Sequence, residues 1–98
     1  MGFKVIWSDP AVTDLEDICS YIARDNPEAA TRVAINIVAH TDLLGSFPFI
    51  GPTYPRGSRG SLRLIVFRSY RILYDVDERR ESVEIIHIRN VARDEQVF

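Results

Sequence analysis

The side chains best suited to chemistry in this chain are arginines, and they cluster in one part of the sequence. Eleven of the twelve basic residues are arginine, and five of them fall within residues 56–71, where no carboxylate occurs. A guanidinium group can bind a phosphate or carboxylate through two parallel hydrogen bonds, which lysine cannot do. The cluster predicts a local positive patch on a chain whose net charge is only −2. The alternative is a solvated face with scattered ion pairs.

Arg71 is the first candidate for a functional role, because it interrupts a pattern typical of a buried strand. In "YRILYDVD" (70–77), large apolar residues occupy every second position. Such alternation predicts a strand with one face on the core, so Arg71 and Asp75 should lie on the other face. Arg71 there could bind an anionic target, or it could simply form an exposed ion pair with Asp75.

His87 is the second candidate, since imidazole titrates near neutral pH and suits a general base. If the strand at 82–89 pairs so that Leu73 faces His87, the imidazole shares the face of Arg71. A shift of one residue in this pairing would turn His87 into the core, as expected for a structural histidine. The other histidine, His40, falls late in a predicted helix and is expected at the surface.

The elements that must position these residues can be located from caps and periodicity. Asp9 and Asn26 are each followed by a proline, as at the start of a helix, and Gly45 and Pro48 should end the second helix. The Pro- and Gly-rich stretch 47–60 predicts a long loop. The expected elements are a strand at 3–8, helices from 10 and 27, and strands at 61–67, 70–77 and 82–89. This β-α-α-β-β-β order predicts an α+β fold, an antiparallel sheet with two helices packed on one face.

The second helix carries more apolar surface than one core face needs. Ala30, Val33, Ile37 and Leu44 make one stripe, but Ile35, Val38 and Leu43 lie outside it. A helix that is apolar on several faces is either buried between layers or covered by a partner.

Composition excludes several classes of protein. The 98 residues support one domain, here 1–98, and no apolar run approaches the roughly 20 residues of a membrane span. A single cysteine, Cys19, forms no internal disulfide, which indicates a reducing cytoplasm. Cysteine and histidines are too scattered for a zinc site, and we expect neither metal nor cofactor.

With these elements placed, the sequence resembles the RelE/ParE superfamily of bacterial toxins from type II toxin–antitoxin systems. The resemblance is carried by "AVTDLEDICSYIARDNPEAA", "LGSFPFIG", "FRSYRILYDVD" and "VEIIHIRNVARD", in this order, over roughly residues 5 to 94. It implies the same α+β fold, a bacterial cytoplasmic location, and an antitoxin encoded by a neighbouring gene. Ile35, Val38 and Leu43 are then expected to bind that antitoxin.

The resemblance also implies one of two activities. RelE-like members are ribosome-dependent mRNA interferases, which cleave mRNA without a metal, and ParE-like members inhibit DNA gyrase. Arg71 matches the arginine of the family's "YR" strand, Arg63 lies near the family's lysines, and Arg93 lies near its C-terminal arginine. Phe98 stands where a tyrosine is expected, so proton-transfer groups are mostly missing. Only His87 could supply them.

We therefore expect a ParE-like toxin rather than an enzyme. The expected target or phosphate patch consists of Arg63, Arg68, Arg71, Arg89 and Arg93. Two alternatives stay open. One is an mRNA interferase, a metal-independent endoribonuclease with Arg71 and His87 as catalytic residues. The other is a degenerate domain that binds its antitoxin and poisons nothing.

Overall fold

Six regular elements follow one another in the computed structural model, which describes residues 2–54 and 62–92 of the chain. They are β1 (Lys4–Trp7), α1 (Asp9–Ala23), α2 (Pro27–Ser46), β2 (Leu62–Phe67), β3 (Tyr70–Asp77) and β4 (Ser82–Asn90). This confirms the predicted β-α-α-β-β-β order. No helix in the described ranges is long and apolar enough to cross a membrane.

Both helices begin at a small polar cap, but the first cap is not the predicted one. Ser8, rather than Asp9, has an extended backbone, and its Oγ accepts a hydrogen bond from the N–H of Ala11 at 3.2 Å. Asp9 becomes the first helical residue, where a carboxylate also suits the positive end of the helix dipole. The second cap is confirmed, since Oδ1 of Asn26 accepts from the N–H of Ala29 at 3.0 Å.

Gly45 does not end α2 as predicted, because the helix continues to Ser46. Gly45 instead allows the start of the chain to approach α2 closely. The N–H of Phe3 donates to the carbonyl of Gly45 at 2.7 Å. A Cβ at position 45 would lie 2.9 Å from the carbonyl oxygen of Phe3, so a side chain there would push the two segments apart.

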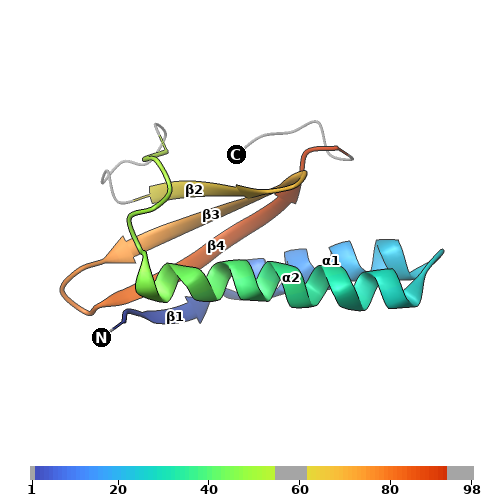
Figure 1. Ribbon diagram of the computed structural model, residues 1–98, viewed down its shortest axis with the longest axis horizontal. Coiled ribbons are helices and arrows are strands. Elements are labelled where there is room, and N and C mark those ends of the chain that lie inside the picture. Colours follow the sequence, from blue (N-terminus) through green and yellow to red (C-terminus); the bar gives the residue numbers. More distant parts are fainter. Residues whose placement is uncertain (1, 55–61, 93–98) are drawn as a thin grey trace.

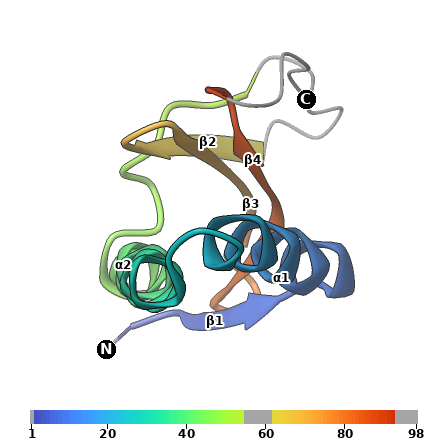
Figure 2. The same ribbon diagram turned by 90° about the vertical axis from the view of Figure 1, so that its right-hand side faces the viewer.

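The four strands form one sheet in the order β1-β4-β3-β2. The last three pair antiparallel, as predicted, whereas β1 joins the edge of β4 in parallel. Parallel pairing needs a long connection, and here α1, α2, β2 and β3 all lie between β1 and β4 in the chain. Figures 1 and 2 show both helices on one side of the sheet, which curves around them from β1 to β2.

The core lies between the helices and the sheet. From β3 it takes the predicted residues Tyr70, Ile72, Tyr74 and Val76, all at most 7% exposed. Ala30, Ile37 and Leu44 of the stripe predicted on α2 are buried, and Val33 is partly buried against the core. Fully or nearly buried apolar residues from the helices and β4 are Ala11, Ile18, Ala30, Ile37, Leu44, Val83, Ile85 and Ile88.

A bulge in β4 decides which face of the sheet His87 occupies. Leu73 pairs with His87, but the next residue of β3, Tyr74, pairs with Ile85. Ile86 is therefore the extra residue of a β-bulge, which lets Ile85 and Ile88 both face the helices. The pairing confirms the register that places His87 on the face away from the helices.

Candidate functional site

The face of the sheet turned away from the helices carries the candidates Arg71, His87 and Arg89. We call it the open face, and its β3–β4 pairs are Arg71 with Arg89, Leu73 with His87, Asp75 with Glu84, and Asp77 with Ser82. Two of the four pairs place like charges directly opposite each other. Like charges in this position destabilise a sheet, so the arrangement is not explained by stability.

The arginine pair forms the positive end of the open face. Arg71 and Arg89 are both half-buried, and Arg71 faces Val66 of β2 on its other side. The alternative in which Arg71 serves only as the partner of Asp75 is not found, because no ion pair within 4.0 Å joins these two described residues. Two adjacent guanidinium groups suit a phosphate or carboxylate of a target.

The carboxylate pair forms the opposite end. Asp75 and Glu84 face each other, and Oδ1 of Asp75 is buried without a hydrogen bond from any described residue. Arg71 and Asp75 are four positions apart along β3, a distance of about 13 Å at about 3.3 Å per residue. The open face therefore changes sign along its length.

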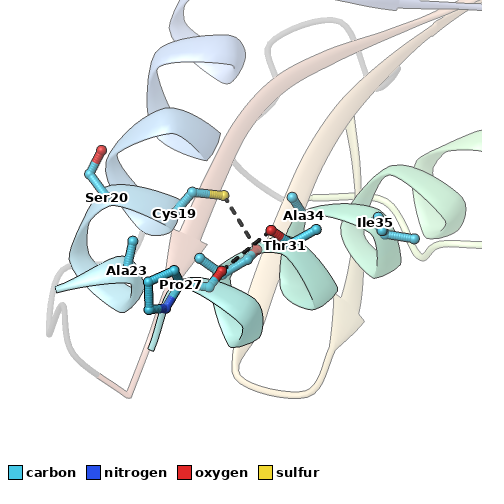
Figure 3. A pocket seen from close by; sticks show the side chains of 8 residues that line it. Cys19, Ser20, Ala23, Pro27, Thr31, Ala34 and Ile35 are labelled. Atoms are coloured by element: carbon cyan, nitrogen blue, oxygen red, sulfur yellow. Dashed lines mark hydrogen bonds between the residues drawn. The ribbon is translucent and has the colours of Figure 1, made fainter. Parts of the chain in front are cut away.

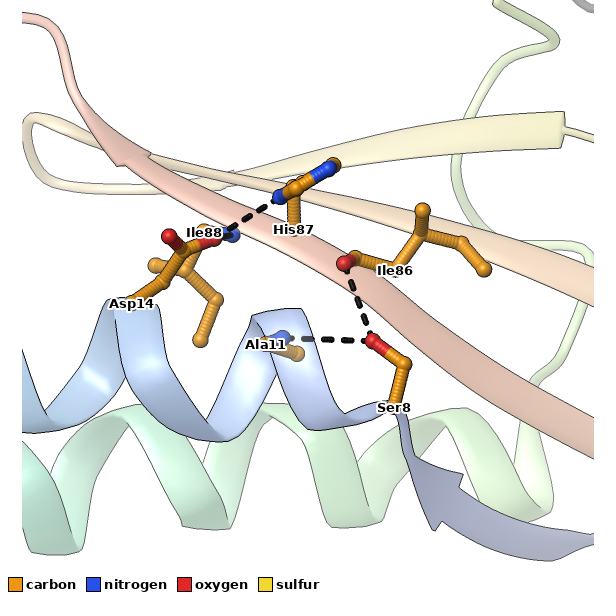
Figure 4. Close-up of polar contacts among 6 residues, drawn as sticks. All are labelled: Ser8, Ala11, Asp14, Ile86, His87 and Ile88. Carbon is orange, nitrogen blue, oxygen red and sulfur yellow. Dashed lines mark hydrogen bonds and ion pairs between the residues drawn. The ribbon is translucent and has the colours of Figure 1, made fainter.

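His87 lies between the two ends and is held by a carboxylate from α1. Its Nδ1 lies 3.0 Å from Oδ2 of Asp14, and the same oxygen accepts the backbone N–H of Ile88 at 2.9 Å. In Figure 4, Ile88 extends toward α1 while His87 extends the other way, and Asp14 reaches up to both. The side chain of Asp14 is 16% exposed and that of His87 is 34% exposed.

Asp14 was not among the candidates predicted from the sequence. The reason for its position is that β1 ends at Trp7, leaving the rest of the edge of β4 without a strand partner. The start of α1 replaces that partner. Ser8 donates its N–H to the carbonyl of Ile85 and its Oγ–H to that of Ile86, both at 3.0 Å, and Asp14 accepts from the next free N–H (Figure 4).

Arg63 does not join the other candidates, because it lies on the face that packs toward the helices. It pairs with Tyr74 across the strands. Its guanidinium donates to the carbonyls of Gly51 at 2.6 Å and Phe49 at 3.3 Å, and it lies 5.1 Å from the centre of the Phe49 ring. Sequence reasoning grouped Arg63 with Arg71 around one phosphate; the structure places the two on opposite faces.

The segment held by Arg63 was predicted as part of a loop, and its described residues pair with β2. The N–H of Tyr54 donates to the carbonyl of Leu62 at 2.8 Å, and the N–H of Leu64 donates to that of Pro52 at 3.1 Å.

Burial raises the pKa of Tyr74, while a hydrogen bond from Gly51 and the charge of Arg63 lower it. The net direction is upward, so this phenol stays neutral well into the alkaline range.

Two further predicted residues fall elsewhere. Arg68 occupies the turn between β2 and β3, exposed at the end of the sheet. Arg93 lies outside the described residues, as do Arg56, Arg59 and Phe98. The described part of the open face thus brings together Arg71, His87 and Arg89 from the predicted set.

The apolar residues of α2 outside the core stripe split into two surfaces. Ile35, 62% exposed, and Val38 border a groove that runs along α2 and into the seam with α1, where small residues let a partner approach. Figure 3 shows the seam, with Cys19 donating to the carbonyl of Ala30 at 3.9 Å. Burial raises the pKa of the Cys19 thiol.

Leu43 belongs to the second surface. It lines a separate hollow of about 170 Å³ with Ile50 and Val66, between the end of α2 and β2. The three residues expected to bind the antitoxin therefore do not form one continuous patch. Within the described residues, no three histidine, cysteine or carboxylate side chains gather as metal ligands do.

The fold is shared with solved structures of two toxin–antitoxin systems. Structures of the chromosomal ParDE toxin–antitoxin system of Pseudomonas aeruginosa (TM-score 0.73, 20% identity, 90% of this chain and 95% of that one) and of the RelBE2 toxin–antitoxin complex of Mycobacterium tuberculosis (TM-score 0.71, 20% identity, 92% and 99%) share this architecture. At such identities the likeness establishes the fold alone.

Sequence comparison establishes the family. Residues 5–95 match the profile of a family described as "ParE toxin of type II toxin-antitoxin system, parDE". The toxin RelE2 of Caulobacter vibrioides is 35% identical over 91 residues, which cover 92% of this chain and 97% of that toxin. The chain therefore belongs to the ParE toxin family of type II toxin–antitoxin systems, within the RelE/ParE superfamily.

Proposed function

We propose that this toxin is ParE-like: it inhibits DNA gyrase by protein contact and is neutralised by its cognate antitoxin. The observation that carries the proposal is the change of sign along the open face. An RNA strand laid along β3 would bring phosphates from Arg71 and Arg89 toward Asp75 and Glu84, which repel them. A protein surface can place carboxylates at one end and cations at the other, matching both pairs.

The shortage of groups that could transfer protons beside the arginines also supports a ParE-like toxin. Metal-free RNA cleavage needs one group that takes the proton of the 2′-hydroxyl and another that protonates the leaving oxygen. Arginine stays charged at ordinary pH and serves neither role. On the described open face His87 is the one imidazole, and the carboxylates lie at the end away from the arginines. The cations for a phosphate are present, but a complementary acid and base beside them are not.

The alternative is a ribosome-dependent mRNA interferase, and one observation favours it. The contact between His87 and Asp14 fixes the orientation of the imidazole, as a carboxylate does for a histidine base. His87 is also two residues from Arg89 and next to the Arg71–Arg89 pair on the same face. In this reading Arg71 and Arg89 bind the cut phosphate and His87 is the base.

The antitoxin is proposed to cover the exposed apolar residues of α2. Relatives with this fold were crystallised with their antitoxins. Ile35 and Val38 border one groove and Leu43 another hollow, so an antitoxin would need to cross α2 to reach all three. Because the groove includes Cys19, antitoxin binding should slow the reaction of this thiol with N-ethylmaleimide.

Induction in bacteria, with and without the neighbouring gene, tests the proposal. We expect blocked growth with filamentous cells, relieved by the neighbouring gene and abolished by Arg71→Ala but not by His87→Ala. Arg79→Ala, an exposed arginine in the turn between β3 and β4, is the matched control and should leave toxicity unchanged. Rapid loss of translated mRNA, abolished by His87→Ala, would instead establish the interferase. Normal growth would leave only a non-toxic, antitoxin-binding domain.

A further inference from the structure

A second cationic site lies away from the open face, between α2 and the turn that joins β2 to β3. It is a pocket of about 240 Å³. Arg32 and Asn36 line it from α2, and Phe67 and Arg68 line it from the hairpin, together with Ala29, Val33 and Tyr70. No carboxylate lines this pocket, so its two guanidinium groups face no negative charge within it.

The cations of this pocket are not neutralised by carboxylates in the described part of the chain. Among the described residues neither Arg32 nor Arg68 forms an ion pair, and the side chain of Asn36 forms no hydrogen bond. Three polar groups that can donate hydrogen bonds therefore converge on one hollow.

The backbone at Arg68 is the second observation. Arg68 has a φ of 55°, in the left-handed region where glycine or asparagine is favoured in turns. An arginine there costs stability relative to glycine. A residue kept in a strained conformation is a reason to look for a function of its side chain.

Aromatic packing holds the guanidinium of Arg68 over the ring of Phe67, and both residues line the pocket. The central carbon of the guanidinium lies 5.5 Å from the centre of the Phe67 ring. The ring of Phe67 is itself held between His40, with centroids 4.0 Å apart, and Tyr70, stacked at 6.5 Å. A guanidinium already held over an aromatic ring loses less freedom when it binds a ligand.

We infer that this pocket binds a carboxylate side chain of a protein partner, with Arg32 and Arg68 gripping the carboxylate from two sides. Its volume is below the 300–1,000 Å³ typical of small-molecule sites and suits a single side chain. The apolar surfaces of Val33 and Phe67 suit the hydrocarbon part of glutamate better than a phosphodiester. The inference does not depend on which target the toxin has, because the pocket is separate from the open face.

Titration of the full-length ¹⁵N-labelled chain with N-acetylglutamate N-methylamide, followed by NMR, tests the inference. We expect millimolar binding that shifts the amides of residues 32–36 and 67–69, and at least tenfold weaker binding of the matched glutamine compound. Equal binding of the two compounds would overturn the inference. Tighter binding of inorganic phosphate than of the glutamate compound, at the same amides, would also overturn it and point to nucleic acid.

Two variants separate binding from folding. Arg68→Gly should weaken binding at least fivefold while raising the urea midpoint, because glycine relieves the strain at φ 55°. Arg32→Gln should weaken binding without changing the midpoint, and Arg79→Gln, in a remote turn, should change neither. Wild-type affinity in both Arg68→Gly and Arg32→Gln would refute the site.

Discussion

Replacing Asp14 with alanine should destabilise the fold more than any other exchange of a charged residue on α1. The carboxylate accepts the N–H of Ile88 at 2.9 Å and contacts Nδ1 of His87 at 3.0 Å. Ile88 is 2% exposed, so water cannot easily replace the lost acceptor. Asp14→Ala thus removes a partner from a backbone group at the part of the β4 edge that β1 does not cover.

The expected cost follows from these two contacts. A hydrogen bond to a charged group contributes about 1.5–3 kcal/mol. The contact with His87 adds at most about 1 kcal/mol, because a third of the imidazole is exposed to water. We expect a loss of about 2–3 kcal/mol for Asp14→Ala. Asp14→Asn, which keeps one acceptor oxygen, should lose about half as much.

Urea unfolding followed by circular dichroism measures this cost. Asp17→Ala, three residues further along α1 and exposed, is the matched control and should change stability by less than about 0.5 kcal/mol. Hydrogen exchange provides a local reading, since the amide of Ile88 should lose protection in Asp14→Ala. The reasoning is refuted if Asp14→Ala and Asp17→Ala are equally stable, or if the Ile88 amide stays protected.

Three further predictions concern the packing of Gly51 and Tyr74. Tyr74→Phe should lower stability by about 1–3 kcal/mol in urea unfolding, because the buried N–H of Gly51 loses its partner hydroxyl at 3.0 Å. In the wild type the pKa of Tyr74 is higher in the folded chain than in the unfolded chain, so the unfolded chain loses the phenol proton first as the pH rises. The free energy of unfolding should therefore keep its full value below about pH 10 and fall above it. Unfolding at several alkaline pH values should show a shallower fall for Tyr74→Phe, and an equal fall would contradict the assignment. Gly51→Ala should cost at least about 2 kcal/mol, since its Cβ would lie 2.6 Å from the carbonyl oxygen of Leu64; a variant as stable as the wild type would contradict that contact.

Much of the fold follows from local patterns that the sequence displays. The alternation in β3 predicts which residues face the helices, and the cap at Asn26 predicts where α2 begins. Both depend on neighbours within a few residues, so a single chain is enough to read them. The same alternation correctly placed Arg71 on the open face.

The features that sequence reasoning missed depend on contacts between distant segments. The parallel pairing of β1 joins it to β4, from which two helices and two strands separate it in the sequence. The face of Arg63 follows from pairing with β3, and its bonds to Phe49 and Gly51 reach a segment that read as a loop. Asp14 meets Ile88 only because β1 ends early. No local pattern marks any of these contacts.

The most direct test of the central claim is a DNA supercoiling assay with purified gyrase and the purified chain. The claim is that the paired arginines of the open face bind a protein target. We predict that the chain blocks supercoiling of relaxed plasmid, and that Arg71→Ala relieves the block while His87→Ala does not. Unimpaired supercoiling, together with cleavage of ribosome-bound mRNA that His87→Ala abolishes, would contradict the account.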